Sequence, residues 1–388
     1  MTQNERLGTI LPADHEAATL TGRVWRPDRG GPSVVTLKGA DLFDVTSAAA
    51  PTMRDLLELD DPSAFLRQQT GERLCSLEEA MDGATAGDGF RLLAPADLQA
   101  IKACGVTFAR SMIERVIEER AGGDFTAAAA IRDKIASAIG AEILSVAPGS
   151  DAAARAKSAL QAEGLWSQYL EVGIGPDAEV FTKTQPMSAV GWGSEIGLHP
   201  ISVWNNPEPE MALAVDSAGR IKGATLGNDV NLRDVEGRSA LLLGKAKDNN
   251  ASAALGPFVR LFDEKYTLDD VRSAEIGLRI EGEDGFELGG SSSMREISRD
   301  PLDLVSQTLG PHHQYPDGLF LYCGTMFSPT QDRDTPGQGF THKLGDVVTI
   351  SEARLGTLRN TVRLSTECPP WRFGAAALMR NLAGRNLI

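Results

Sequence analysis

The chain from Trp166 onward consists of short runs of β-forming residues separated by glycine and proline. Strands that follow one another without long intervening helices favour an antiparallel or mixed β architecture over a doubly wound parallel sheet. Residues 216–219, Asp-Ser-Ala-Gly, separate two of these runs and predict a hairpin turn. We expect strands at 180–182, 211–215, 276–280, 319–322 and 347–350.

The first part of the chain mixes helices and strands. Residues 33–37, Ser-Val-Val-Thr-Leu, predict a strand, and residues 51–69 predict a helix. The stretch 82–88 is small and polar, as is typical of a linker. A chain of 388 residues also exceeds the usual size of a single core. We therefore expect an N-terminal α+β domain at 1–90 and a catalytic domain at 91–388.

Residues 107–121 carry the clearest helical pattern. Phe108, Met112 and Val116 recur at four-residue steps, and polar residues occupy the opposite face. Two alanine-rich helices are expected at 124–139 and 150–163.

Composition excludes several classes of protein. The net charge of −15 argues against a nucleic-acid partner, because phosphate binding needs a basic face. No apolar run is long enough to span a membrane, and residues 1–22 lack the apolar core of a signal peptide. The four cysteines are widely spaced, which favours a reducing compartment over a disulfide framework. These features lead us to expect a cytoplasmic protein.

Three acidic residues form the most suggestive chemical pattern. On extended backbone, Glu208 and Glu210 point to the same face, because strand side chains alternate. A hairpin brings the following strand back, so that Asp229 reaches that face too. Three carboxylates make an all-oxygen site that suits Mg²⁺ or Mn²⁺. The alternatives are two acids on a solvated edge strand and a backbone-capping turn residue at Asp229.

Lys247 follows this pattern in a polar loop. A lysine near a divalent metal could stabilise an enolate, although a lysine in such a loop is more commonly solvated.

Several ordered motifs together resemble the fumarylacetoacetate hydrolase superfamily. The resemblance covers about residues 92–365. It implies a β-roll or mixed β-sandwich catalytic domain, usually dimeric, with a smaller N-terminal domain, and hence an α+β fold that is mostly β. The matching runs are Glu-Pro-Glu at 208–210, Asn-Asp-Val-x-x-Arg-Asp at 228–234, Lys247 nine residues before Gly-Pro, Gly-Thr at 324–325, Gly-Asp-Val-Val at 345–348 and Leu-Gly-Thr-Leu-Arg-Asn-Thr-Val at 355–362.

The resemblance also implies roles for individual residues. It implies that Arg233 and Lys247 lie near the keto group and carboxylate of a substrate, and that Thr325 hydrogen-bonds that carboxylate. It further implies that the metal ligands are Glu208, Glu210 and Asp229.

One family motif is altered in this chain. Hydrolases and decarboxylases of the family carry Gly-x-Asn-Tyr-x-x-His-x-x-Glu, whose histidine and glutamate form a proton-transfer dyad. Here the glutamate matches as Glu114, but Ser111 replaces the histidine. The change disfavours a carbon–carbon hydrolase that activates water with this dyad. We predict that Lys247, Glu114, Arg233 and Ser111 contribute to catalysis.

A further set of runs is similar to a sugar-acid branch, the 2-keto-3-deoxy-D-xylonate (or D-arabinonate) dehydratases. This similarity implies Mg²⁺-dependent dehydration of a 2-keto-3-deoxy-D-pentonate to 2,5-dioxopentanoate in pentose catabolism, by a homodimer or larger homo-oligomer. The alternatives are hydrolysis of a carbon–carbon bond in a 2,4-diketo-3-deoxy sugar acid and a non-catalytic scaffold. The runs lie at 104–109, 114–120, 165–172, 228–234, 313–318 and 331–343.

Overall fold

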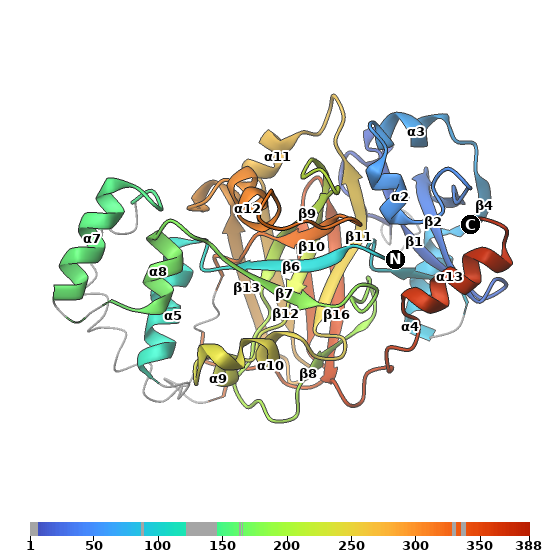
Figure 1. Ribbon diagram of the computed structural model, residues 1–388. Coiled ribbons are helices and arrows are strands. Elements are labelled where there is room, and N and C mark those ends of the chain that lie inside the picture. The colour runs from blue at the N-terminus through green and yellow to red at the C-terminus, as the bar shows by residue number, and fades with distance from the viewer. Residues whose placement is uncertain are drawn as a thin grey trace.

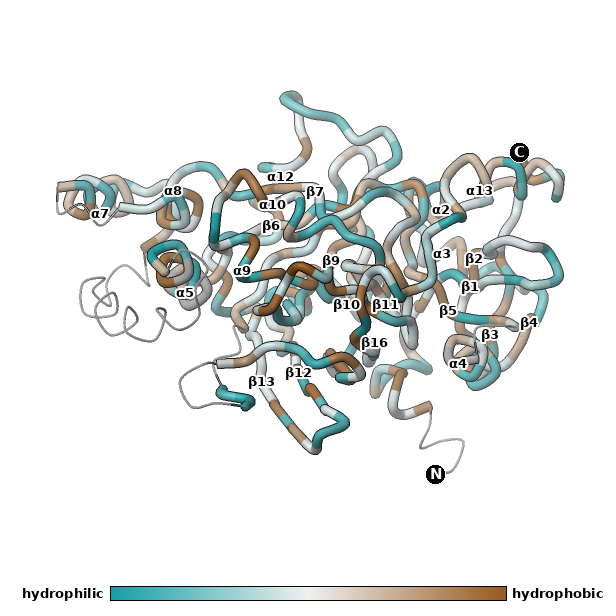
Figure 2. The backbone as a smooth tube through the Cα atoms, turned by 90° about the horizontal axis from the view of Figure 1, so that it is seen from below, coloured by the Kyte–Doolittle hydropathy of each residue, from teal (hydrophilic) through white to brown (hydrophobic). Residues whose placement is uncertain are grey.

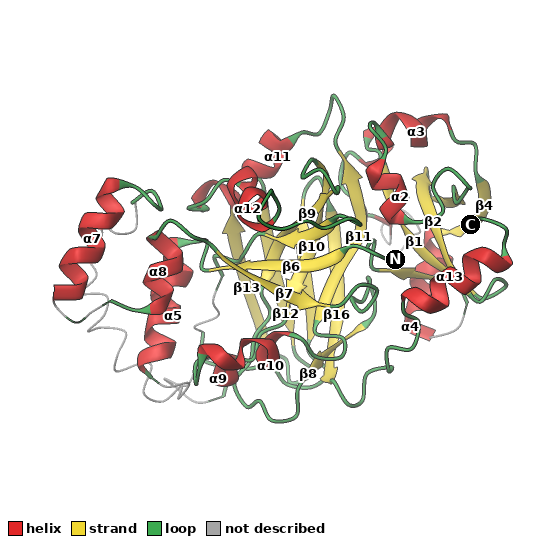
Figure 3. Cartoon of the chain, in the orientation of Figure 1, coloured by secondary structure: helices red, strands yellow, loops and turns green. Residues whose placement is uncertain are grey.

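Two β-sheets form the centre of the molecule. The computed structural model describes residues 7–86, 89–121, 146–162, 164, 166–327, 331–334 and 339–388. Most strands occupy the middle of the molecule, and helices lie at its two ends and above and below the central strands (Figures 1 and 3). This arrangement confirms the expected α+β fold that is mostly β.

The larger sheet of the described residues has 11 strands in the order β4-β3-β2-β1-β11-β10-β9-β14-β6-β7, with β5 paired to β1. Its strand pairs are antiparallel, apart from the parallel pair β14 and β6. Its strands are β1 (Leu20–Arg26), β2 (Gly31–Lys38), β3 (Asp41–Asp44), β4 (Glu72–Ser76), β5 (Arg91–Leu93), β6 (Ala100–Gly105), β7 (Glu179–Thr184), β9 (Pro209–Val215), β10 (Ile221–Asp229), β11 (Ala253–Leu261) and β14 (Leu319–Tyr322).

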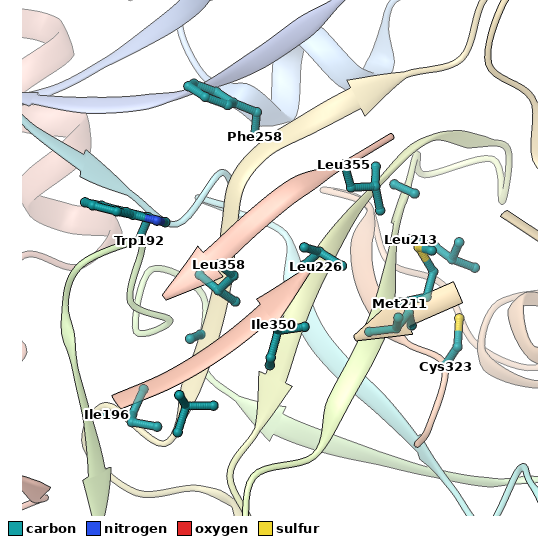
Figure 4. Close-up of a cluster of buried hydrophobic side chains, with 14 of the residues drawn as sticks. Trp192, Ile196, Met211, Leu213, Leu226, Phe258, Cys323, Ile350, Leu355 and Leu358 are labelled. Carbon is teal, nitrogen blue, oxygen red and sulfur yellow. The ribbon is translucent and has the colours of Figure 1, made fainter. Parts of the chain in front are cut away.

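The second sheet has five strands among the described residues, in the order β13-β12-β15-β16-β8. Side chains such as Met211 and Leu226 from the larger sheet meet Ile350 and Leu358 from this one, and all four are buried (Figure 4). Hydrophobic stretches accordingly lie along β9 and β10 in the interior (Figure 2). The strands are β8 (Glu195–Leu198), β12 (Glu275–Glu281), β13 (Glu287–Ser293), β15 (Val347–Glu352) and β16 (Gly356–Leu364).

Short helices surround the sheets. One group, α2, α3, α4 and α13, gathers around the N-terminal strands, and another, α5, α7 and α8, lies at the opposite end (Figure 1). The described helices are α2 (Met53–Glu58), α3 (Pro62–Gln68), α4 (Leu77–Ala86), α5 (Ala109–Arg120), α7 (Asp151–Ala162), α8 (Gln168–Ile174), α9 (Arg233–Glu236), α10 (Leu243–Lys247), α11 (Leu268–Arg272), α12 (Pro301–Thr308) and α13 (Ala375–Gly384), with 3-10 turns η1 (His15–Ala17), η3 (Ala240–Leu242) and η4 (Met294–Glu296).

Most expected elements are confirmed, and two differ. The expected helix at 51–69 is two helices, because Asp61 caps α3 by accepting from the Ala64 amide and Pro62 follows directly. The prediction of a linker at 82–88 was wrong for residues 82–86, because α4 continues to Ala86. Ser76 and Glu79 cap the start of α4 by hydrogen-bonding each other's backbone amides. The expected helix at 124–139 and the linker residues 87–88 lie outside the described residues.

The N-terminal strands are continuous with the central sheet, since β1 pairs with β11. The C-terminal helix α13 also returns to this part of the molecule, where Asn381 Nδ2 donates to the Arg29 carbonyl. The division at residue 90 therefore stays a prediction. No helix of the described residues is long and apolar enough to cross a membrane.

Candidate metal centre and active site

The hairpin of β9 and β10 brings three carboxylates together at the end opposite its turn. Its register pairs Glu210 with Gly227, and the Asp229 amide donates to the Glu208 carbonyl over 3.0 Å. Asp229 therefore lies beside Glu208, and Glu208 and Glu210 share a face through the alternation of strand side chains. One carboxylate oxygen from each of the three residues lies within 4.8 Å of the others, and all three residues are buried. The hairpin and the juxtaposition expected from the sequence are both present.

Glu210 gives the clearest electrostatic reason to expect a cation among these carboxylates. Burial raises the pKa of Glu210 well above its ordinary value, and the charges of Asp229 and Glu208 raise it further. The Gly324 amide donates to Glu210 Oε2 over 2.6 Å, but the described residues give this carboxylate no ion pair. A divalent cation would relieve this repulsion and burial cost. The three hard oxygen donors fit Mg²⁺ or Mn²⁺.

Two buried lysines flank the carboxylates. Lys247 Nζ hydrogen-bonds Glu208 Oε2 and lies 3.1 Å from Asp229 Oδ2, while Lys183 Nζ lies 2.8 Å from Asp229 Oδ1. Although burial raises the pKa of Asp229, the charges of Lys183 and Lys247 outweigh it and hold the pKa below its ordinary value. Burial lowers the pKa of Lys247, but Asp229 and Glu208 hold it above its ordinary value. Lys247 is therefore an ammonium donor at neutral pH.

Helix α5 contributes a third cation. Arg115 forms ion pairs with Glu208 and, over 3.0 Å, with Glu236 Oε2. Burial raises the pKa of Glu208, while Lys247 and Arg115 lower it. The arginine thus ties helix α5 to the start of β9.

Glu179 faces this cluster from β7. A Cβ atom on Gly105 would lie 1.9 Å from Glu179 Oε2, so the carboxylate packs directly against that glycine. The described residues provide Glu179 with no ion pair. Burial, and then the charge of Glu236, raise the pKa of Glu179 to about 7, although Lys247 and Arg115 oppose the shift. A carboxyl group with such a pKa can take up and release protons near neutral pH.

Apart from Lys183, these groups line one cavity. Thr325 and Lys247, both predicted to bind substrate, contribute to its wall together with the three carboxylates. The lining residues are Cys104, Gly105, Val106, Arg115, Glu179, Phe181, Glu208, Glu210, Asp229, Glu236, Lys247, Gly324 and Thr325.

Two other predicted residues lie outside the described cavity lining, and a third cannot be placed relative to it. Glu114 is half-buried on α5 and is not among the described lining residues. Arg233 is buried on α9, where its guanidinium carbon lies 4.2 Å from the centre of the Trp204 ring, and it does not line the cavity either. The Ser111 side chain lies outside what the structure describes. The roles of these residues stay predictions.

Arg115, Glu179 and Lys183 were not predicted from the sequence to belong to the site. A usable signal was present for two of them, because Glu179, Phe181 and Lys183 alternate along β7 and therefore share a face. For Arg115, the helical pattern indicated only a polar face.

Comparisons with known proteins give one matching family and two curated relatives. The fumarylacetoacetate (FAA) hydrolase C-terminal family matches residues 164–363. A 2-dehydro-3-deoxy-D-arabinonate dehydratase of Saccharolobus solfataricus is 32% identical over 185 residues, which cover 48% of this chain and 58% of the relative. A probable 2-keto-3-deoxyxylonate dehydratase of Haloferax volcanii is 31% identical over 194 residues, which cover 50% of this chain and 63% of the relative. The match thus spans less than two thirds of each curated relative.

Solved structures show the same fold. A 2-keto-3-deoxy-D-arabinonate dehydratase complexed with magnesium and 2,5-dioxopentanoate superposes with a TM-score of 0.62. That likeness covers 89% of this chain and 99% of the other, at 23% identity. It is a likeness of fold.

Proposed function

Since this chain belongs to the fumarylacetoacetate hydrolase family, we propose that it is a magnesium-dependent dehydratase of 2-keto-3-deoxy-D-pentonate, the single compound named after either D-xylonate or D-arabinonate, with 2,5-dioxopentanoate as its product. The observation that carries the proposal is the cavity in which three buried carboxylates meet Lys247 and Glu179. The names of the two curated relatives support the choice of substrate.

The charges of the cavity suit a small anionic 2-keto acid. Glu208, Glu210 and Asp229 would hold Mg²⁺, which supplies a Lewis acid for the negative charge that develops at the C2 oxygen. Lys247 remains protonated and would donate to the same developing charge. Thr325, at the cavity wall, would hydrogen-bond the substrate carboxylate through its hydroxyl. The Arg233 guanidinium lies on the Trp204 ring outside the cavity lining, and its positive charge would attract the anionic substrate from there.

The reaction requires a base at C3 and an acid at C4. We assign the removal of the C3 proton to Glu179, because this carboxyl group lines the cavity and has a pKa of about 7. The C4 hydroxyl then leaves as water after accepting a proton, and a C3–C4 double bond forms. Transfer of a proton from C5 to C3 and of the C5 hydroxyl proton to C4 completes the aldehyde. Glu114 and Ser111 on α5 would assist the departure of the C4 hydroxyl.

Product analysis tests this function. The purified protein, Mg²⁺ and 2-keto-3-deoxy-D-xylonate are incubated, and the products are identified by mass and by trapping of the aldehyde. We expect one five-carbon product lighter than the substrate by one water. Two shorter fragments, or an unchanged substrate in the presence of Mg²⁺, would contradict the proposal. A parallel reaction with 2-keto-3-deoxy-L-pentonate, which differs from the substrate only in its configuration at C4, shows whether the C4 configuration matters.

Two broader features belong to the same proposal. The described cysteines are free and buried, which supports a reducing compartment such as the cytoplasm. The family resemblance supports a homodimer or a larger homo-oligomer. Sedimentation equilibrium of the purified chain tests the second point, and a monomer at micromolar concentration would contradict it.

A further inference from the structure

A second cavity of about 440 Å³ lies between the N-terminal strands and the segment that leads into α13. It shares no lining residue with the metal-site cavity. Its walls come from β1 and β5, from the segment after β7 and from the residues before α13. The lining residues are Arg23, Trp25, Arg91, Leu93, Met187, Ser188, Ala189, Val190, Asn250, Pro369, Pro370, Trp371, Arg372 and Phe373.

Aromatic rings form part of this cavity. Trp25 and Phe373 pack edge to face with 5.2 Å between ring centres. Trp371 is 47% exposed, and its indole nitrogen donates to the Phe373 carbonyl over 3.0 Å. A large indole held in place while its surface remains open provides a flat apolar wall against which another ring can stack.

Positive charge is concentrated in the same place. Three of the 14 lining residues are arginines and none is acidic, although the whole chain carries a net charge of −15. The guanidinium carbon of Arg91 lies 4.9 Å from the centre of the Trp25 ring. Within the described residues, neither the Arg91 nor the Arg372 side chain forms an ion pair or a hydrogen bond, although the Arg91 backbone pairs with Trp25 in the sheet. Buried Arg23 is different, because it donates to backbone carbonyls and lies 3.8 Å from Asp97 Oδ2.

Specific contacts hold the walls in place. Asn250 Nδ2 donates to the carbonyls of Ser365, over 3.0 Å, and of Pro369, over 3.3 Å, which fixes the segment before α13. Arg385 anchors α13 itself by donating to the Pro32 carbonyl over 2.8 Å. Met187, another lining residue, has a φ of 68°, a strained backbone conformation for a residue with a side chain. The cavity is therefore preformed.

We propose that this cavity binds a small anion that joins a phosphate group to an aromatic ring, the chemistry of a nucleoside monophosphate. The ring would stack on the exposed face of Trp371. The phosphate would accept from the guanidinium groups of Arg91 and Arg372, because the planar fork of arginine matches phosphate oxygens. The volume lies in the range of small-molecule sites, about 300–1,000 Å³.

Adenosine monophosphate is the probe, titrated into the full chain by calorimetry, with adenosine and inorganic phosphate in parallel. We expect saturable binding of the nucleotide and at least ~10-fold weaker binding of either fragment. Arg91→Met should weaken nucleotide binding by ~10-fold or more, since a hydrogen bond to a charged group contributes about 1.5–3 kcal/mol. Trp371→Leu should weaken binding of the nucleotide and leave that of phosphate unchanged.

Matched variants separate this cavity from other surfaces. Arg380→Met removes an exposed arginine of α13 outside the cavity and should leave the affinity unchanged. Lys247→Met alters the metal-site cavity and should also leave it unchanged. Absence of saturable binding at 10 mM nucleotide, on the order of the weakest useful affinities, would overturn the proposal. So would equal affinities of wild type and Arg91→Met, or loss of binding in Lys247→Met. Arg91→Lys, which keeps the charge, checks that the cavity remains folded.

Discussion

Lys183 Nζ lies 2.8 Å from Asp229 Oδ1 and also donates to the backbone carbonyl of Lys247 over 2.6 Å. One buried ammonium therefore holds both a proposed metal ligand and the chain segment that carries the proposed enolate-stabilising lysine. The Lys183 side chain is fully buried, so water cannot replace either contact. The positions of Asp229 and Lys247 depend on a residue that itself lies outside the cavity wall.

Lys183→Met should destabilise the metal-free protein by about 3–5 kcal/mol, because it leaves the buried charge of Asp229 without one of its partners. Mg²⁺ would supply replacement charge, so the metal should raise the unfolding midpoint of the variant more than that of wild type. Urea unfolding with and without Mg²⁺ measures both effects. An unchanged midpoint in the metal-free variant would show that Lys183 and Asp229 are not coupled.

Glu210→Gln should lower Mg²⁺ affinity by at least ~10–100-fold, the range that the loss of even an outer-shell partner costs. It should also raise the unfolding midpoint of the metal-free protein, because one of three repelling buried carboxylates becomes neutral. Calorimetric titration with Mg²⁺ and thermal unfolding report these quantities. The matched control is Glu264→Gln, which neutralises an exposed acid. Wild-type Mg²⁺ affinity in Glu210→Gln would exclude Glu210 as a ligand.

Lys247→Met should preserve Mg²⁺ binding while kcat falls by ~10²–10³, the usual effect of removing one electrostatic stabiliser of developing charge. Lys245→Met is the control, since Lys245 lies on the same short helix and is exposed. Steady-state kinetics of the two variants decide the matter. Equal kcat values for the two variants would show that Lys247 has no catalytic role and serves only in its structural ion pairs.

Site residues that lie close together in the chain could be predicted from the sequence. Residues that reach the site from distant parts of the chain could not. Glu208, Glu210 and Asp229 meet because alternation and a single hairpin place them together, and both can be derived from nearby residues. Arg115 contacts Glu208 from 93 positions away, and Lys183 contacts the Lys247 carbonyl from 64 positions away. These contacts depend on how β7 and α5 pack beside the hairpin, which no local pattern encodes. The division of the expected helix 51–69 into two helices, by contrast, could have been predicted locally, because Asp61-Pro62 is a typical start of a new helix.

The raised pKa of Glu179 predicts a pH dependence of stability. Its value of about 7 lies above the ordinary 4.5, so in this window the folded state binds a proton that the unfolded state has released. The free energy of unfolding contributed by this group therefore falls as pH rises from about 4.5 to 7. Glu179→Gln should remove that slope from the metal-free protein, whereas Glu264→Gln should keep it. Urea midpoints measured across this pH range test the difference, and parallel curves for Glu179→Gln and wild type would contradict it.

Glu114 and Glu179 compete for the role of the C3 base, and hydrogen exchange separates them. Glu179 lines the cavity and Glu114 does not, so Glu179→Gln should stop exchange of the C3 protons with deuterated solvent as well as product formation. Glu114→Gln should leave that exchange intact and slow only product formation, because its proposed role is to assist departure of the C4 hydroxyl. Both variants should bind Mg²⁺ as wild type does. Loss of C3 exchange in Glu114→Gln, with exchange retained in Glu179→Gln, would reverse the two assignments. Wild-type rates of exchange and turnover in both variants would instead move the proton transfers to Lys247 or to a water.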